Sequence, residues 1–325
     1  MREELLLELE NEYEQQRIRN EQEEALRKER IRLEQPEIYA MTKERENLIF
    51  GTLRDILNRK ADTEGLPEKM EALSAQIRVK LTENGFPADY LAPVYRCPVC
   101  KDTGKTGDLI KEPCECYKKA YQRKLREKIG LTRDRKETFE NFDENLFPNE
   151  NIPGQEFSQR ELMNHYRRIC EEWADGYPNA RCRDLLLTGG TGLGKTFLLR
   201  AMAERLIERD VNVLIISAYR MIEMLRKSYF DNDDSASELM DVDVLMIDDL
   251  GSEPLMQNIT VEQLFNLLNE RQGRGLSTVI STNLEMPKFR ERYTERVASR
   301  LRDSMNCKVL SLMGKDIRTG GNQRA

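Results

Sequence analysis

The sequence predicts an α/β protein: a parallel sheet flanked by helices in the second half of the chain, preceded by a mainly helical N-terminal module with a metal site. Three observations support this. From about residue 161, short apolar runs alternate with amphipathic helices, the pattern of a parallel sheet covered on both faces. The first of these runs enters a glycine-rich loop ending in Lys195 and Thr196. Two close cysteine pairs lie further upstream, between residues 97 and 116.

Length and composition limit the classes of protein that the chain can belong to. Its 325 residues allow about two domains. Charged residues make up 34% and the net charge is −6, which argues against a chain coated in nucleic acid, although local patches can differ. No apolar run approaches the ~18 residues that span a bilayer, and seven scattered cysteines do not resemble a disulfide scaffold. We therefore expect a cytoplasmic protein.

The first part of the chain predicts charged helices. Residues 1–35 hold seven Lys and Arg against eleven Asp and Glu, with sparse apolar positions, and Pro36 ends the pattern. This predicts a charged helical arm, either solvated or weakly paired; a partner-binding coiled coil is the alternative. Helices expected at about 37–60 and 67–83 each have one apolar face. With the cysteines that follow, they form a predicted module over residues 36–136.

Four cysteines in this module predict a structural zinc site. Cys97 and Cys100 are separated by thirteen residues from the pair Cys114 and Cys116. Such pairs are typical of four-thiolate zinc sites, in which a tetrahedral ion replaces a core. A redox dithiol and an iron–sulfur cluster are the alternatives. The three cysteines outside this spacing, Cys170, Cys182 and Cys307, are expected to be ordinary buried thiols.

A basic segment follows the cysteines. Residues 117–136 hold nine Lys and Arg against two acids, with Tyr117 and Tyr121 among them. Such a helix can follow a phosphate backbone while its tyrosines stack on bases. A solvated helix, or a surface that docks an acidic protein, fits equally well. Residues 137–160, with Phe139, Phe142, Phe147, two prolines and Gly154, are expected to be a linker to the sheet-forming part at 161–325.

The glycine-rich loop predicts a phosphate-binding site. It fits the pattern G-x-x-x-x-G-K-[ST], with a strand before it and a helix of about 195–209 after it. Glycines allow backbone N–H groups to turn toward an anion, the lysine adds charge for the β- and γ-phosphates, and the threonine hydroxyl is a ligand for Mg²⁺. The residues expected to bind nucleotide are Gly189, Gly190, Thr191, Gly192, Leu193, Gly194, Lys195 and Thr196.

Two later strands are expected to supply the remaining polar groups. The buried run at 242–247 ends in Asp248 and Asp249. Ligands bind at the carboxyl ends of parallel strands, so both carboxylates are expected beside the phosphate loop. Asp248 would hold Mg²⁺ and Asp249 would orient the attacking water. Asp-Asp-Leu-Gly is also good turn chemistry, which is the alternative. Asn283 follows the run at 277–282 and is expected near the γ-phosphate, a plain turn asparagine being the alternative.

Arginines follow this strand. Residues 288–318 hold nine Lys and Arg against four acids, and Arg296 and Arg300 lie four apart on one helical face. An arginine there could reach a phosphate bound by a neighbouring copy and stabilise the transition state. Surface salt bridges are the alternative.

These motifs, in this order, resemble the AAA+ ATPases of the DnaC/DnaI helicase-loader group and, closely behind, the IstB-type transposition ATPases. The resemblance runs over roughly 138–320 and includes GGTGLGKT, VLMIDDLG, the STN strand end, ERVASRL and GKDIR. It implies that Asp248 and Asp249 are the Walker B pair and Asn283 is sensor 1. It implies further that Arg300 is the arginine finger, with Arg296 the weaker candidate, and that Arg318 is a sensor-2-like arginine.

The resemblance also implies partners. The family has a helical insertion that faces single-stranded DNA, and the residues that lie in that region here are Tyr219, Arg220, Lys227 and Tyr229. A zinc-bearing N-terminal module that docks on the replicative helicase resembles DnaI-type loaders, although this chain has four cysteines where a histidine can occur, and a long charged helix. The expected cofactors are ATP, Mg²⁺ and structural Zn²⁺.

The sequence therefore predicts an ATPase that self-associates through its AAA+ domain and delivers a DnaB-family helicase onto single-stranded DNA. Its turnover is expected to be slow and to depend on assembly. One alternative is an IstB-like transposition-targeting ATPase that binds duplex DNA and a transposase. The other is a nucleotide-binding switch with little turnover.

Overall fold

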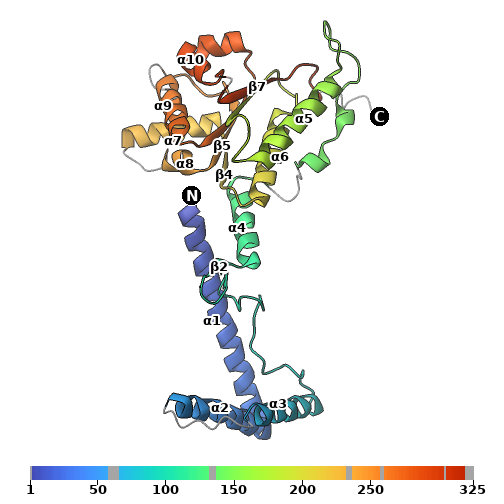
Figure 1. The fold of residues 1–325 in the computed structure, drawn as a ribbon, viewed down its shortest axis with the longest axis vertical. Coiled ribbons are helices and arrows are strands. Elements are labelled where there is room, and N and C mark those ends of the chain that lie inside the picture. Colours follow the sequence, from blue (N-terminus) through green and yellow to red (C-terminus); the bar gives the residue numbers. More distant parts are fainter. Residues whose placement is uncertain are drawn as a thin grey trace. The chain divides into compact units, whose positions relative to one another are not determined.

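The structure, a computed structural model, describes residues 2–57, 66–131, 137–231, 236–256, 260–303 and 305–318. The chain divides into two compact units (Figure 1). We call Leu7–Tyr117 the helical unit, and Met1–Leu6 together with Lys118–Ala325 the sheet unit. Helices α1 (Arg2–Glu34) and α4 (Glu115–Lys128) each contribute residues to both units. Each unit is described by itself below.

The sheet unit contains a five-stranded parallel sheet in the order β4-β5-β6-β3-β7, which confirms the predicted fold class. Its strands are β3 (Asp184–Thr188), β4 (Val213–Ser217), β5 (Val244–Leu250), β6 (Ser277–Thr282) and β7 (Cys307–Ser311). Sequence reasoning missed β7, because only three apolar residues interrupt a basic segment there. The strand pairs with β3 along its whole length, from Asp184 opposite Cys307 to Thr188 opposite Ser311.

Helices cover both faces of the sheet (Figure 1). Alternate residues of a strand point to opposite faces, and β3 follows this rule. Leu185 and Leu187 pack in the core beneath α5 (Gln159–Gly176) and α6 (Lys195–Glu208), whereas Leu186 packs in the core on the other face. The second face is covered by α7 (Ala218–Asp231), α8 (Ser237–Asp241), α9 (Thr260–Gly273) and α10 (Met286–Arg300). Both faces are buried, which explains the continuous apolar runs of these strands.

The expected linker at 137–160 packs against the sheet unit. It forms two 3-10 helices, η1 (Phe139–Asn141) and η2 (Glu144–Leu146), and the side chains of Phe139 and Phe147 are buried in the core beneath α5 and α6. Helix α5 then begins with a capping box, because Ser158 accepts from the Glu161 N–H while the Glu161 carboxylate accepts from the Ser158 N–H. The aromatic residues of this segment therefore serve the core.

The basic residues at the end of α4 contact acidic groups of the same unit. Leu125 is buried in the sheet-unit core, and Arg126 Nε lies 2.6 Å from a carboxylate oxygen of Glu204. Lys128 pairs with Glu4 and, at 3.3 Å, with Glu238. The basic end of α4 is therefore paired with acidic side chains of this chain's own sheet unit. The end of the predicted basic segment, 132–136, lies outside the described residues.

The helical unit has its own small core. Residues 7–34 of α1, α2 (Pro36–Leu57) and α3 (Leu66–Glu83) surround the buried side chains of Ile31, Ile38, Ile77 and Leu81. The last residues of the helix expected at 37–60 lie outside the described part of the chain. Residues 7–34 differ from the expected solvated arm, because Leu9 and Ile31 are fully buried and Asn20 donates to Asp102 at 2.7 Å. Buried positions such as Leu9 and Ile31 lie several turns apart on α1, so the sequence shows only a weak apolar stripe there.

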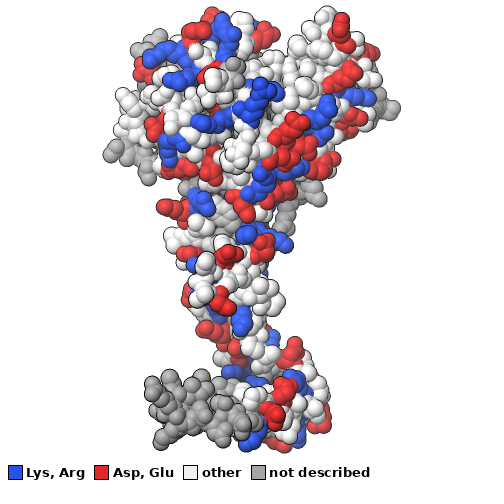
Figure 2. Space-filling view, viewed as in Figure 1, with Lys and Arg blue, Asp and Glu red and all other residues white. Residues whose placement is uncertain are grey.

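Charged side chains of both signs are interspersed over the face of the molecule seen in Figure 2. Ion pairs within helices, such as Arg27 with Glu23 and Arg30 with Glu34, bring charges of opposite sign together. Within the described residues, no helix combines the length and the apolar character needed to cross a bilayer.

Candidate nucleotide site and cysteine metal site

The phosphate loop connects β3 to α6 at the carboxyl edge of the sheet. Gly194 caps α6 in the left-handed conformation, with φ 86° and ψ 9°, which only glycine adopts readily. Lys195, 7% exposed, lies at the start of α6, and its Nζ donates to the backbone oxygens of Gly189, at 2.7 Å, and Gly190. The ammonium group is therefore held inside the loop where a phosphate would be bound.

The GKDIR segment packs against this loop. The Ile317 N–H donates to the oxygen of Gly192 at 3.1 Å. Gly192 has φ 68°, and a Cβ at this position would lie only 1.6 Å from Asp316 Oδ1. The segment is held on α5 by Gln159, whose amide bonds both the N–H and the oxygen of Lys315 at 2.9 Å. The loop therefore has room for glycine alone at Gly192.

Oxygen atoms of three side chains from neighbouring elements meet beside the loop. Thr196 Oγ1 lies 3.0 Å from Asp248 Oδ2, and Ser281 Oγ donates to Asp248 Oδ1 at 2.5 Å. Hydroxyl and carboxylate oxygens are the ligands that Mg²⁺ prefers, usually with phosphate oxygens and water completing the shell. The donor set thus fits Mg²⁺ next to a bound nucleotide. Sequence reasoning missed Ser281, although its place near the end of the strand that Asn283 follows was a signal.

The second carboxylate of β5 is bound by the neighbouring strand end. The Asp249 N–H donates to Ser281 Oγ at 2.9 Å, and Asn283 Nδ2 donates to Asp249 Oδ1. Asp249 has φ 58°, the left-handed region that is rare for a residue with a side chain. This conformation departs from the strand and holds the carboxylate at the sheet edge. A carboxylate and an amide fixed together can orient a water molecule for attack on a γ-phosphate.

A cavity of about 530 Å³ joins these groups. From the predicted set it is lined by Thr191, Gly192, Leu193, Gly194, Lys195, Thr196, Asp248, Asp249, Asn283 and Arg318. Gly189 and Gly190 do not line it, but their backbone oxygens accept hydrogen bonds from Lys195, which does. Arg200 also lines the cavity and pairs with Glu137 at 2.7 Å; neither residue was predicted.

Burial and charge act in opposite directions on Lys195. Burial lowers the pKa of its ammonium group most strongly, the charges of Asp249 and Asp248 raise it, and the charge of Arg318 lowers it, which together leave the pKa at about 8. A bound triphosphate would add negative charge and favour the protonated form.

Two predicted groups lie away from the cavity. Arg296 and Arg300 line a separate open groove of about 880 Å³, where their guanidinium groups lie 4.8 and 5.8 Å from the ring centre of Phe265. They do not reach the nucleotide cavity of their own copy. Four residues were predicted to contact DNA. Tyr219, Arg220, Lys227 and Tyr229 all lie exposed on α7.

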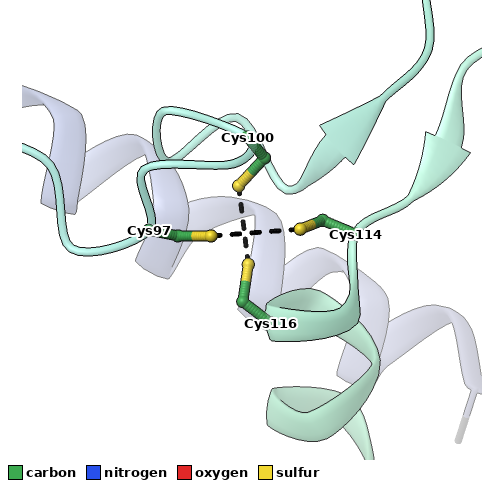
Figure 3. A group of neighbouring side chains, drawn as sticks. All are labelled: Cys97, Cys100, Cys114 and Cys116. Atoms are coloured by element: carbon green, nitrogen blue, oxygen red, sulfur yellow. Dashed lines mark hydrogen bonds between the residues drawn. The ribbon is translucent and has the colours of Figure 1, made fainter.

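The four cysteines converge in the helical unit (Figure 3). Cys97 and Cys100 lie on a loop, Cys114 directly follows β2 (Glu112–Pro113), which pairs with β1 (Lys105–Thr106), and Cys116 lies in the first turn of α4. All four Sγ atoms lie within 4.8 Å of one another, with 3.9 Å from Cys97 to Cys114 and 3.5 Å from Cys100 to Cys116. Zn–S bonds of about 2.3 Å in a tetrahedron place sulfur atoms roughly 3.8 Å apart. The set therefore fits zinc.

Neighbouring groups hold this cluster in place. The Asp102 carboxylate accepts the N–H groups of Arg96 and Cys97, at 2.8 and 2.7 Å, besides the Asn20 amide from α1. Tyr13, also on α1, lies 3.2 Å from Cys116 Sγ through its hydroxyl group. A hydroxyl that donates to a metal-bound thiolate fixes the ligand and tunes its charge. Of the three cysteines outside the cluster, Cys170 and Cys307 are buried, as expected, and Cys182 is half-buried.

Together the sheet, the glycine-rich loop at its carboxyl edge and the cavity between loop and carboxylates define a P-loop protein of AAA+ type. The chain belongs to the family of IstB-like ATP-binding proteins, whose sequence profile matches residues 130–325. The resemblance predicted from the motifs is thereby confirmed.

Individual relatives match shorter parts. Over 114 residues the chain is 28% identical to the replicative helicase loader DnaI of Bacillus subtilis (strain 168), which covers 34% of this chain and 37% of DnaI. It is 32% identical over 103 residues to a protein of insertion sequence IS1162 from Pseudomonas fluorescens, covering 31% of this chain and 44% of that protein. The chain thus spans less than half the length of either relative. A crystal structure of the DnaC helicase loader has 20% identity and a TM-score of 0.44, covering 54% of this chain and 98% of that one.

Proposed function

We propose that this protein is a cytoplasmic, ATP-dependent loader that delivers a hexameric replicative helicase of the DnaB family onto single-stranded DNA. The observation that carries the proposal is the joining, in one chain, of an IstB-like ATP-binding unit with a four-cysteine helical unit. The similarity to the loader DnaI supports it. In this proposal the helical unit binds the helicase, its cysteines hold a structural zinc ion, and the exposed side of α7 faces the DNA.

The predicted residues of the nucleotide cavity have distinct roles in the proposed ATPase reaction. Lys195 and the loop N–H groups bind the phosphates, and Thr196 with Asp248 holds Mg²⁺. Asp249 and Asn283 orient the attacking water, and Arg318 neutralises charge on the triphosphate. Arg300 would act in the site of a neighbouring copy, since it lies outside the cavity of its own. Hydrolysis would then depend on assembly and release the loader from the helicase.

The direct test is co-purification of the full chain with a DnaB-type hexamer. We expect the two proteins to elute together in the presence of ATP, and single-stranded circular DNA to acquire bound helicase. The double variant Cys100→Ser with Cys116→Ser should lose helicase binding while ATP affinity stays within twofold. Cys182→Ser, a half-buried thiol outside the cluster, is the matched control. Equal helicase binding by both variants would contradict the assignment of the helical unit.

A second candidate is a transposition-targeting ATPase. The family profile and the similarity to the IS1162 protein favour it. It predicts preferential binding to duplex DNA and capture of a transposase in place of the helicase. Tight ATP binding without turnover, even with helicase and DNA present, would instead identify a nucleotide-binding switch. Competition between labelled single-stranded and duplex DNA separates the first two functions.

A further inference from the structure

A buried glutamate links the turn after Asp249 to helix α10. Glu253 is 1% exposed, and its carboxylate is bound from both sides. The Gly251 N–H donates to Oε2 at 2.8 Å, and the hydroxyl of Tyr293, which is fully buried, donates to Oε1. A buried carboxylate keeps its donors firmly, because losing one leaves charge without compensation in a medium of low dielectric constant.

A second connection runs parallel to the first. Arg292 Nη2 donates to the backbone oxygen of Glu253 and lies 3.5 Å from its Oε1. Two successive residues of α10 thus hold one residue of the turn. The turn itself is tied to the nucleotide cavity, because the backbone oxygen of Asp249 accepts the N–H and the hydroxyl of Ser252, at 3.2 and 2.8 Å.

Helix α10 is interrupted directly after these contacts. Thr294 has φ 68° and ψ 162°, which is not helical and is unfavourable for a β-branched residue. The segment beyond this kink, 295–300, carries Arg296 and Arg300 over the Phe265 ring. A kink at which the backbone is already strained is a natural place for the helix to change direction.

We propose that Glu253 is a positioning residue that couples the nucleotide cavity to the arginine-bearing end of α10. When a bound nucleotide interacts with Asp249, the turn formed by residues 249–253 shifts. Glu253 then moves Tyr293 and Arg292 with it, and the segment after Thr294 changes its orientation. The coupling lies within one copy. It rests on the proposed function only in one respect, namely that Arg300 acts in the nucleotide site of a neighbouring copy.

Hydrogen exchange of the full chain, at a concentration where it is monomeric, tests this coupling. A non-hydrolysable ATP analogue should slow exchange in residues 286–300 at least threefold in the unchanged protein. In Tyr293→Phe, which loses only the hydroxyl group that binds Glu253, we expect less than 1.5-fold slowing, with analogue affinity within threefold. Tyr166→Phe is the matched control: it also loses one hydroxyl bond in the sheet unit, to Ser311 O, and should respond like the unchanged protein.

Glu253→Gln gives a second measurement that does not depend on the stability of the tyrosine variant. It keeps the side-chain shape but replaces one acceptor oxygen by a donor, so it should also lose most of the slowing. The coupling is overturned if the analogue leaves residues 286–300 unchanged in the natural sequence, or if all three variants respond equally. Failure of helicase delivery or of arginine sharing would not alter these monomer measurements, so the two proposals fail separately.

Discussion

At the scale of single residues, the position of Lys195 sets the behaviour of the nucleotide site. Burial leaves its ammonium group with a pKa of about 8, well below the 10.5 of a solvated lysine. The unfolded chain therefore binds more protons than the folded one between these values, and the free energy of unfolding rises with pH across that range. Below about pH 8 the shift opposes folding by about 3 kcal/mol. A triphosphate would relieve this penalty.

Nucleotide affinity should follow the same titration. Up to about pH 8 the lysine is charged before and after binding, so affinity should change little. At higher pH, binding must take up a proton, and affinity should fall by up to about tenfold for each pH unit. Calorimetry in two buffers of different ionisation enthalpy measures this uptake directly. Constant affinity and no proton uptake between pH 7 and 9.5 would contradict the buried state of Lys195.

The Asp249–Asn283 pair should matter for turnover rather than for binding. Asp249→Asn keeps the size of the side chain and loses its charge, so ATP affinity should stay within threefold. The hydrolysis rate of the assembled protein should fall on the order of 10²–10⁴-fold, the contribution of a positioned acid–base group. Ser252→Ala, in the same turn but bonded only to backbone, is the control. Equal loss in both variants would point to a purely structural effect.

At the scale of elements, the phosphate loop and the GKDIR segment act as one structure. Gly192→Ala would add both a left-handed backbone penalty of about 1–2 kcal/mol and a collision with Asp316. Gly275→Ala carries only the first, since it has φ 76° with nothing within 4 Å of its added Cβ. We expect the Gly192 variant alone to lose ATP binding, at least tenfold, in a fluorescence titration. Adding Asp316→Ala should restore part of it.

The cysteine loop and α1 should likewise respond together to metal removal. Without a cation the four thiols have no common partner, and the bonds from Asp102 and Asn20 lose their fixed geometry. We expect a chelator that extracts the metal to speed hydrogen exchange in residues 97–116 and around Tyr13, but to leave ATP affinity unchanged. Verified metal loss with unchanged exchange would rule out a structural metal. Return of protection on adding Zn²⁺ is the reciprocal check.

The sequence predicted which groups lie side by side where a pattern is local. The phosphate loop, the Asp248–Asp249 pair and Asn283 each belong to a strand end, and strand ends meet at one sheet edge in any parallel fold. Prediction failed where the signal depends on partners far along the chain. The segment β7 is a strand only because it pairs with β3. The side chains of Phe139 and Phe147 are core residues only because α5 and α6 lie beside them. The contacts of α1 involve single residues, Tyr13 and Asn20, on an otherwise polar helix.

At the scale of the whole molecule, Arg300 lies outside the cavity of its own copy, so in the proposed function activity would be a property of the assembly. The hydrolysis rate per copy should rise at least tenfold between dilute, monomeric protein and concentrated or helicase-bound protein. Arg300→Ala should abolish this rise without changing ATP affinity. Arg274→Ala removes an exposed arginine that pairs with Asp241 at 2.9 Å, and should leave the rise intact. A fast monomeric enzyme would contradict the assignment.

The order of the strands has one more consequence. β6 lies between β3 and β5, so the strand that enters the phosphate loop and the strand that carries Asp248 and Asp249 are held two interstrand steps apart, roughly 10 Å. Backbone hydrogen bonds set this spacing, so side-chain changes do not alter it. It fixes how far apart the groups that bind the phosphates and the group that binds their cation are anchored. A change in the loops around the rim would therefore alter which molecules they recognise and leave the distance between these two strands as it is.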